Sequence, residues 1–338
     1  MKIVNNDNIP EVVVRALQNQ PEHITYGNIS VTTLIDSPQV NLLKKVHAEE
    51  LEMEASSALF ALMGTALHKV MEYSAFKSAA VRNFIKGLEA VLDMAKTAKS
   101  EEFKQDLKEV ADLMIAIATN HLSDAIERDT LFEQSMIIEI DGMSVSGTAD
   151  MVKQSTKTLI DNKYTTIWSY IYPNARKKYA EQLNIYAYIL RTLGIEIEKI
   201  QVLAFFRDWS KGRMKTTKDY PKQQIMLIDI EVWTDYECRS FIQERIYAHK
   251  QNEDGNIPCT PDEMWADSDT WAVKVDKIKK AHRVYTTENE ADVEMKLQQL
   301  KNPKKEYWVE ERKGSRKRCN DYCPVADFCK QNQAYLKQ

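Results

Sequence analysis

The chain has 338 residues, 43% of them hydrophobic, so it can bury a sizeable core and is long enough for two domains. Its formal net charge of −4 argues against a protein that coats nucleic acid through overall positive charge, so any nucleic-acid contact has to depend on local basic clusters. No stretch approaches the roughly 20 continuous apolar residues of a membrane span, and residues 1–6 lack the core of a signal peptide, so we expect a cytoplasmic protein that contacts no membrane.

Residues 55–75, rich in Ala, Leu and Met, predict a helix. Gly64, His68 and Glu72 follow one another at i, i+4 and i+8, so this helix carries all three on one face. His68 is then either a packed, hydrogen-bonded core residue or a metal ligand. Residues 81–128 are charged and amphipathic, and we interpret them as a helical insertion.

Two apolar segments next predict strands, the first over residues 136–152 with a break at an Asp-Gly pair, and the second over 158–164. A turn between these segments brings Asp150 close to Asp161. Asp161 and Lys163 share one face of the second strand, because side chains alternate along a strand. Converging carboxylates suit Mg²⁺ or Mn²⁺, although Asp-x-Lys is also common in a surface ion pair.

Residues 176–190 predict a helix in which Gln182 precedes Tyr186 by four residues. This pair is either a surface and core pair or part of a site. Further elements are predicted as strands at 200–208 and 224–233, a helix at 235–252, and a mostly helical stretch at 277–302. Cys238, in the helix at 235–252, is expected to be a buried structural thiol.

Basic residues interleaved with aromatic ones predict a nucleic-acid surface, with a solvated loop as the alternative. The richest stretch, residues 301–318, has eight basic residues against three glutamates. The candidate DNA-binding residues are Arg176, Lys177, Lys178, Tyr307, Trp308, Arg316, Lys317 and Arg318. A smaller basic cluster is formed by Arg207, Lys211, Arg213 and Lys215.

Four of the five cysteines form a further candidate site: Cys259, Cys319, Cys323 and Cys329. Disulfides are disfavoured because the count is odd and no secretory segment is present. Four thiolates can form a tetrahedral zinc site or hold an iron-sulfur cluster.

The ordered set Gly-x3-His, Gly-x-x-Asp, Asp-x-Lys and Gln-x3-Tyr resembles the RecB-like branch of the PD-(D/E)xK nuclease superfamily, which includes AddB-type helicase-nucleases, CRISPR adaptation exonucleases and phage exonucleases. The resemblance covers about residues 29–329, and residues 29–35 resemble the first segment of that family. It implies an α/β, restriction-endonuclease-like core, in which helices flank a central mixed sheet, with a helical insertion and a cysteine-clasped C-terminal tail. We therefore divide the chain into an N-terminal segment 1–54, a nuclease core 55–253 that includes the insertion 81–128, and a cysteine region 254–338 that packs on the core.

The same resemblance implies a role for each motif residue. His68, Asp150 and Asp161 become ligands of Mg²⁺ or Mn²⁺, and Lys163 becomes the catalytic lysine. Gln182 and Tyr186 become the helix motif that faces the site and assists catalysis. Glu133 lies where this family often carries a strand glutamate, and is either an outer ligand or a strand-edge charge, of which we prefer the second.

The cysteines resemble the iron-sulfur staple of AddB-type and CRISPR-associated members, which implies a 4Fe-4S cluster. In this chain three residues separate Cys319 from Cys323, where two are usual. Zinc and a metal-free site therefore remain alternatives.

Together these features predict a metal-dependent DNA exonuclease that acts on single-stranded or duplex ends, in phage-type replication, recombination or repair in a bacterial host cytoplasm. The chain has no Gly-x4-Gly-Lys-Ser/Thr motif, so an unwinding helicase, or a single-strand-binding protein, would be a separate partner. The alternatives are a non-catalytic nucleic-acid-binding or assembly subunit that retains the fold, and a structural zinc protein. The intact acidic and lysine residues favour the enzyme, because a dead site has no physical need to keep charges together.

Overall fold

The computed structural model describes residues 2–18, 27–74, 87–91, 93–94, 100–122 and 129–337. Within these residues the chain forms two compact units. The sheet unit comprises Lys2–Ile35 and Glu52–Tyr247, and the cysteine unit comprises Asp36–Leu51 and Ala248–Gln338. The division at residues 54 and 253, and the packing of 254–338 on the nuclease core, stay predictions.

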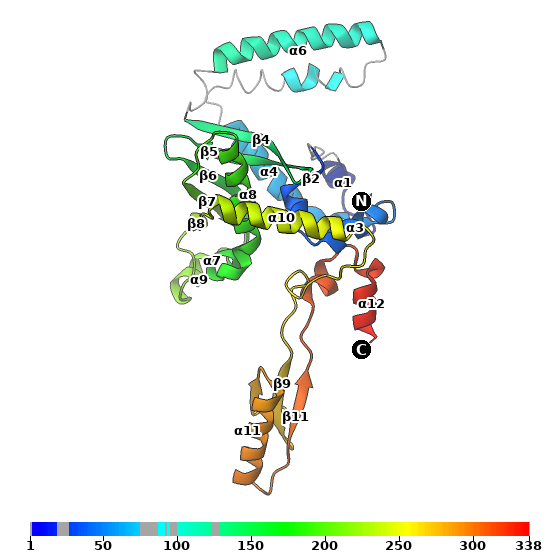
Figure 1. Cartoon of the computed structure of the whole chain (residues 1–338), viewed down its shortest axis with the longest axis vertical. Coiled ribbons are helices and arrows are strands. Elements are labelled where there is room, and N and C mark those ends of the chain that lie inside the picture. Colours follow the sequence, from blue (N-terminus) through cyan, green and yellow to red (C-terminus); the bar gives the residue numbers. More distant parts are fainter. Residues whose placement is uncertain are drawn as a thin grey trace. The chain divides into compact units, whose positions relative to one another are not determined.

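A six-stranded mixed sheet forms the centre of the sheet unit (Figure 1). Its strands are β2 (Ile29–Ser30), β4 (Thr130–Ile140), β5 (Met143–Lys153), β6 (Thr158–Thr165), β7 (Lys199–Phe206) and β8 (Ile225–Ile230). They pair in the order β2-β5-β6-β7-β8, and β4 pairs with β5. The β2–β5 and β6–β7 pairs are parallel and the others are antiparallel. The predicted fold class is confirmed.

A two-residue turn sets the register of β4 against β5. Asp141 and Gly142 have φ angles of 51° and 71°, the left-handed values that a type I′ hairpin turn needs at both positions. The turn pairs Ile140 with Met143, and the inward-facing side chains of β4, such as Met136, are buried in the core. The Asp-Gly break in the sequence is therefore a hairpin turn.

The sheet unit also contains the helices α1 (Glu11–Gln18), α2 (Val31–Leu34), α4 (Leu59–Ser74), α6 (Glu101–Leu122), α7 (Trp168–Ile171), α8 (Lys177–Thr192), α9 (Lys211–Thr216) and the part of α10 (Asp235–Gln251) up to Tyr247. Helix α8 has 16 residues, of which eight are buried, and Asn184 among them is fully buried. The Asn184 side chain donates to the carbonyls of Ala180 and Glu231 and accepts from the Trp233 amide, so it joins α8 to the segment that leads into α10. Cys238 is fully buried in α10, as predicted for a structural thiol.

Part of the predicted insertion is helical, in α6 and over residues 87–91 and 93–94. The remainder of the stretch 81–128 lies outside the described residues. Two short strands elsewhere in the sheet unit, β1 (Lys2–Val4) and β3 (Glu52–Glu54), pair in parallel. None of the described helices is long and apolar enough to cross a membrane.

The cysteine unit contains a three-stranded antiparallel sheet in the order β10-β9-β11. Its elements are α3 (Pro38–Val46), β9 (Thr270–Val275), β10 (Arg283–Tyr285), α11 (Glu288–Lys301), β11 (Tyr307–Arg312) and α12 (Lys330–Leu336). The prediction of a mostly helical stretch at 277–302 is wrong in its first part. The segment around Val284 pairs with β9 instead, and α11 begins only where the Thr287 side chain caps it by accepting from the Glu290 amide.

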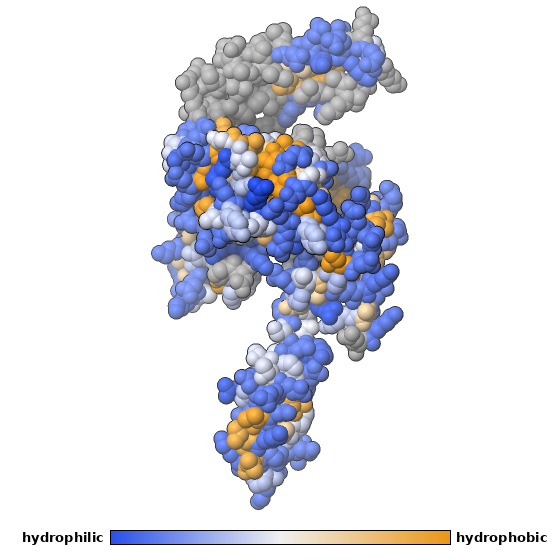
Figure 2. Space-filling view, in the orientation of Figure 1, coloured by the Kyte–Doolittle hydropathy of each residue, from blue (hydrophilic) through white to orange (hydrophobic). Residues whose placement is uncertain are grey.

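Helix α11 exposes Val293, Leu297 and Leu300, and Figure 2 shows a hydrophobic patch over this helix. Beside it, residues 307–312 form an edge strand rather than a loop.

The close approach of Gly147 to Tyr186 gives a stability test of the sheet unit. A Cβ at Gly147 would lie 2.5 Å from Cε1 of the buried Tyr186 ring, so Gly147→Ala has to displace that ring. We expect a loss of about 1–3 kcal/mol in the free energy of unfolding, the usual cost of overpacking a core. Urea unfolding measures it.

Gly212→Ala is the matched control, because the nearest heavy atom to its Cβ would be Ser210 Oγ at 3.7 Å. Gly212 lies in α9, so alanine there should leave stability unchanged or slightly higher. Equal stability of the Gly147→Ala variant and the wild type would contradict the packing described.

Candidate active site

Strand β5 has an unpaired stretch along the side that pairs with β2 and β6. On that side β2 pairs with Val145 and Ser146, whereas the pairing with β6 begins only at Met151. Beyond the Met151–Ile160 pair the strands separate, and the backbone amide of Asn162 donates to Asp150 Oδ2 at 2.7 Å. The Asp150 carboxylate therefore takes the place of a strand partner and is held in the gap.

His68 and Glu133 lie beside this carboxylate. His68 Nδ1, on α4, lies 3.5 Å from Asp150 Oδ2. Ligand atoms of His68, Glu133 and Asp150 all lie within 4.8 Å of one another. One imidazole and two carboxylates form a donor set that suits Mn²⁺ or Mg²⁺, so these residues fit the divalent metal expected from the sequence.

The sequence left two roles open for Glu133, an outer ligand or a strand-edge charge, and its place in this group favours the outer ligand. It lies on β4 directly opposite Asp150, between the pairs Phe132–Met151 and Gln134–Ala149. Its φ of 47° is left-handed, which is costly for a residue other than glycine and is found mainly at functional sites. The Asp-Gly turn could have revealed this, since seven residues back from Ile140 and seven forward from Met143 lead to Glu133 and Asp150.

The remaining motif residues form a chain of polar contacts. Lys163 Nζ lies 2.7 Å from Asp161 Oδ2, as their shared strand face predicts. Lys163 Nζ also donates to Gln182 Oε1 at 3.2 Å, and Gln182 Nε2 donates to the Tyr186 hydroxyl at 3.0 Å. The Glu72 side chain, the third on the predicted helix face, lies outside the described residues.

Burial sets the ionisation of the site. It raises the pKa of Asp150 to about 8, and the nearby Asp161 charge adds to the effect. Burial lowers the pKa of His68, so its imidazole is neutral and ready to bind a metal at physiological pH. For Lys163 burial opposes the charge, but the Asp161 contact outweighs it and the pKa is raised. The site thus keeps a charged lysine beside a carboxyl group that is reluctant to ionise.

The candidate DNA-binding residues fall in different settings. Arg176 donates to the Tyr170 carbonyl at 3.4 Å, and Lys177 and Lys178 begin α8 beside it. Tyr307 and the exposed Trp308 lie on β11.

Three residues of the C-terminal basic stretch have partners in the cysteine unit. Arg316 stacks over Tyr335, with the guanidinium 3.8 Å from the ring centroid, and Lys317 lies 2.9 Å from Asp267. Arg318 is buried, and its Nη2 donates to both carboxylate oxygens of Asp36 at 2.7 and 3.0 Å. Arg318 is thereby part of a buried ion pair rather than of an open surface.

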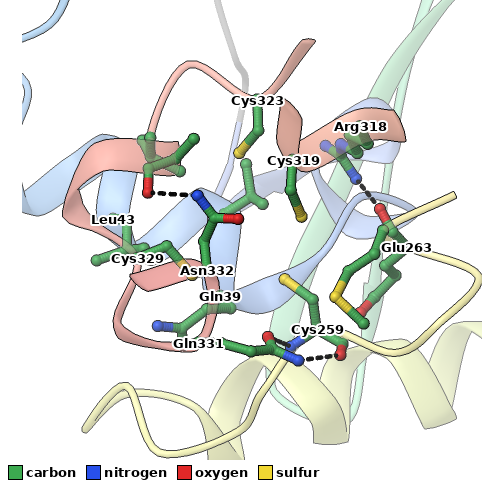
Figure 3. Close-up of a pocket in the computed structure, with 14 residues that line it drawn as sticks. Gln39, Leu43, Cys259, Glu263, Arg318, Cys319, Cys323, Cys329, Gln331 and Asn332 are labelled. Carbon is green, nitrogen blue, oxygen red and sulfur yellow. Dashed lines mark hydrogen bonds between the residues drawn. The ribbon is translucent and has the colours of Figure 1, made fainter. Parts of the chain in front are cut away.

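The four predicted cluster cysteines line one cavity in the cysteine unit (Figure 3). Cys259 and Cys329 are buried, and burial raises the pKa of Cys259 to about 11. Gln331 of α12 accepts from the Cys259 amide at 2.8 Å and donates to its carbonyl at 3.0 Å, which joins the two chain segments. Asn332 Oδ1, in the same wall, is buried and has no hydrogen-bond partner among the described residues.

The raised pKa of Asp150 predicts a pH-dependent stability. Because the folded, metal-free protein holds a proton that the unfolded chain releases, its stability is greatest at low pH and falls as the pH rises towards about 8. Asp150→Asn keeps an acceptor for the Asn162 amide and removes this titration. Urea unfolding in EDTA measures the free energy of unfolding at pH 5.5 and at pH 8.5. Between these two pH values the wild type should lose on the order of a few kcal/mol more of this free energy than the variant. Parallel pH profiles would contradict the raised pKa.

Solved structures similar to this chain include two of low sequence identity. SSO0001 has a TM-score of 0.38 and 15% identity, over 72% of this chain and 85% of that one. A phage-related exonuclease from Haemophilus somnus 129PT has a TM-score of 0.25 and 19% identity, over 53% of this chain and 87% of that one. No curated protein matches the chain. The model of the PD-(D/E)XK nuclease superfamily matches residues 42–330, and the chain belongs to that superfamily.

Proposed function

We propose that this protein is a metal-dependent DNA exonuclease that hydrolyses phosphodiester bonds at single-stranded or duplex ends. The observation that carries the proposal is the group of His68, Glu133 and Asp150 ligand atoms beside a charged, half-buried lysine. A divalent cation with these ligands would lower the pKa of a water molecule and offset negative charge on the phosphate.

The side chains of the chain itself supply the remaining steps. Lys163 would orient the attacking water or neutralise charge on the phosphate oxygens, since it is a fixed cation at the open edge of β6. Gln182 and Tyr186 would fix the position of the ammonium group through their hydrogen bonds. Asp161 is kept as a proposed ligand, because its charge acts on both Asp150 and His68.

The RecB-like branch, the exonuclease mode, the DNA substrate, the phage setting and the cytoplasmic location are parts of the same proposal. A separate helicase or single-strand-binding protein would supply unwound DNA. Buried carboxylates and a lysine kept together favour an enzyme over a non-catalytic subunit, because such charges are costly to bury without a use.

For the cysteine site we propose a 4Fe-4S cluster, with zinc as the alternative. Among the described residues, no three cysteine sulfurs lie within 4.8 Å of one another, unlike the ligand atoms at His68. Four thiolates that line one cavity can hold either group, and the resemblance of the cysteine order to the iron-sulfur staple supports the cluster. Bonds from the cysteines to such a cluster would link α12 to the segment that carries Cys259.

Cleavage of end-labelled and circular DNA in Mg²⁺ and Mn²⁺ tests the enzyme. Asp161→Ala and Lys163→Ala should each lower the rate at least about 100-fold, since each removes a charge acting on the transition state. EDTA should abolish cleavage, and circular DNA should survive. The control is Asp229→Ala, which breaks an exposed strand ion pair with Lys199 at 3.3 Å and should leave the rate unchanged. If the wild type and Asp161→Ala behave alike in both metals, the interpretation of this site as the active site of an enzyme is lost.

Metal content and absorbance of anaerobically purified protein test the cysteine site. The wild type should be brown and contain iron, and Cys323→Ser should lose that metal and melt at a lower temperature, because a bound group adds its binding free energy to stability. Cys238→Ser is the control, since that thiol is buried away from the cavity. A colourless protein with zinc would establish the alternative, and a wild type without metal would end both.

A further inference from the structure

We propose that Trp168 and Tyr172, on and just after α7, form a stacking platform for bases of single-stranded DNA, and that the basic residues around them hold its phosphates. The proposal rests on the proposed nuclease function and narrows its substrate to DNA with an unpaired strand at the site. The platform lies wholly within the sheet unit.

The two aromatic rings are stacked on each other and open to solvent. Their centroids lie 5.5 Å apart with an interplanar angle of 18°. Trp168 is 51% exposed and Tyr172 is 55% exposed. Exposing half of a large apolar ring to water costs free energy. Two parallel rings also present a flat surface on which a base can stack.

The opposite face of the same short segment is fixed in the core. The ring of Tyr170 packs edge-on against that of the buried Phe206, with 6.1 Å between the ring centroids. Ile167 is also buried. The Ile167 amide donates to Asp208 Oδ1 at 2.8 Å. The exposed pair is thus held outward by a rigid support, so a base that stacks on it orders little of the protein.

The platform lies directly beyond the catalytic strand. Trp168 follows Lys163 by five residues, and the strand between them ends at Thr165. Tyr179 joins the two places, because its hydroxyl lies 3.2 Å from Thr165 Oγ1 and its ring centroid lies 5.5 Å from Lys163 Nζ. Five residues span at most about 18 Å, so a strand bound at Lys163 reaches the platform within a few nucleotides.

Cations surround this edge of the sheet. Strands β6 and β7 are parallel, so their ends meet there, and the Arg207 amide donates to the Thr165 carbonyl at 2.9 Å. The exposed Arg207 guanidinium lies 3.6 Å from the centroid of the Phe60 ring on α4, which forms a second flat, cationic surface. Helix α9 follows β7 and exposes three basic side chains, those of Lys211, Arg213 and Lys215.

Stacking rings together with cations at the same end of the strands are the combination that binds single strands without sequence preference. Bases in a duplex are already paired and stacked, so they cannot use the platform. The positive charge also disfavours a second copy of this chain as the occupant, since like surfaces would repel.

Binding of a labelled oligothymidine strand in EDTA, followed by fluorescence anisotropy, tests the platform without cleavage. Trp168→Ala and Tyr172→Ala should each weaken binding about fivefold or more, the usual effect of removing one stacking ring. Trp168→Phe should keep most of the affinity. Replacing Lys211, Arg213 and Lys215 together by Gln should flatten the salt dependence, by about 0.7 in the log–log slope for each phosphate that the variant no longer neutralises.

Tyr236→Ala is the matched control. Tyr236 is an exposed aromatic residue at the start of α10, which follows β8. Because β8 runs antiparallel to β7, Tyr236 lies at the opposite end of these strands from the platform. It should bind the strand like the wild type, and the variants at Trp168, Tyr172 and Tyr236 should each bind a blunt duplex like the wild type.

Two results would overturn the platform: full affinity of Trp168→Ala for the strand, or an equal loss for strand and blunt duplex. A change in molecular mass of Trp168→Ala with unchanged DNA binding would also overturn it, in favour of a self-association surface. Because no metal is present, these outcomes do not depend on whether Asp161→Ala abolishes cleavage. A platform that binds in a protein that does not cleave would leave the inference standing and remove the proposed function.

Discussion

The candidate active site depends on one hydrogen bond, from the Asn162 amide to the Asp150 carboxylate, where β5 and β6 separate. A buried backbone amide that loses its strand partner has to be satisfied by another acceptor. Using a carboxylate for this purpose fixes the Asp150 side chain at the fork of the sheet. His68, Glu133 and the Asp161–Lys163 pair then gather around a carboxylate that cannot move away.

The same fork is energetically costly without a cation. Burial opposes ionisation of Asp150, and Glu133 is held in a left-handed conformation beside it. A divalent metal would offset the cost of ionising Asp150, because it places a positive charge beside the carboxylate. The packing elsewhere is ordinary by comparison, with eight buried residues in α8 and an Asn184 whose hydrogen bonds are all within the unit.

Local rules were enough to predict much of this arrangement from the sequence. The shared face of Asp161 and Lys163 follows from strand alternation, and the Gln182–Tyr186 contact follows from helical spacing. The place of Glu133 opposite Asp150 was not predicted, because it depends on the register of the hairpin. Arg318 was misjudged because its partner, Asp36, is 282 residues away in the chain and no local pattern reports it. The strand around Val284 was missed because it exists only through pairing with β9.

The most direct measurement of the central claim is an anomalous difference map from crystals of the protein soaked in Mn²⁺. The account predicts a peak at about 2.2 Å from His68 and from the Glu133 and Asp150 carboxylates, with Lys163 close by. A peak elsewhere with this group of ligands empty, or a site filled without Glu133, would contradict it.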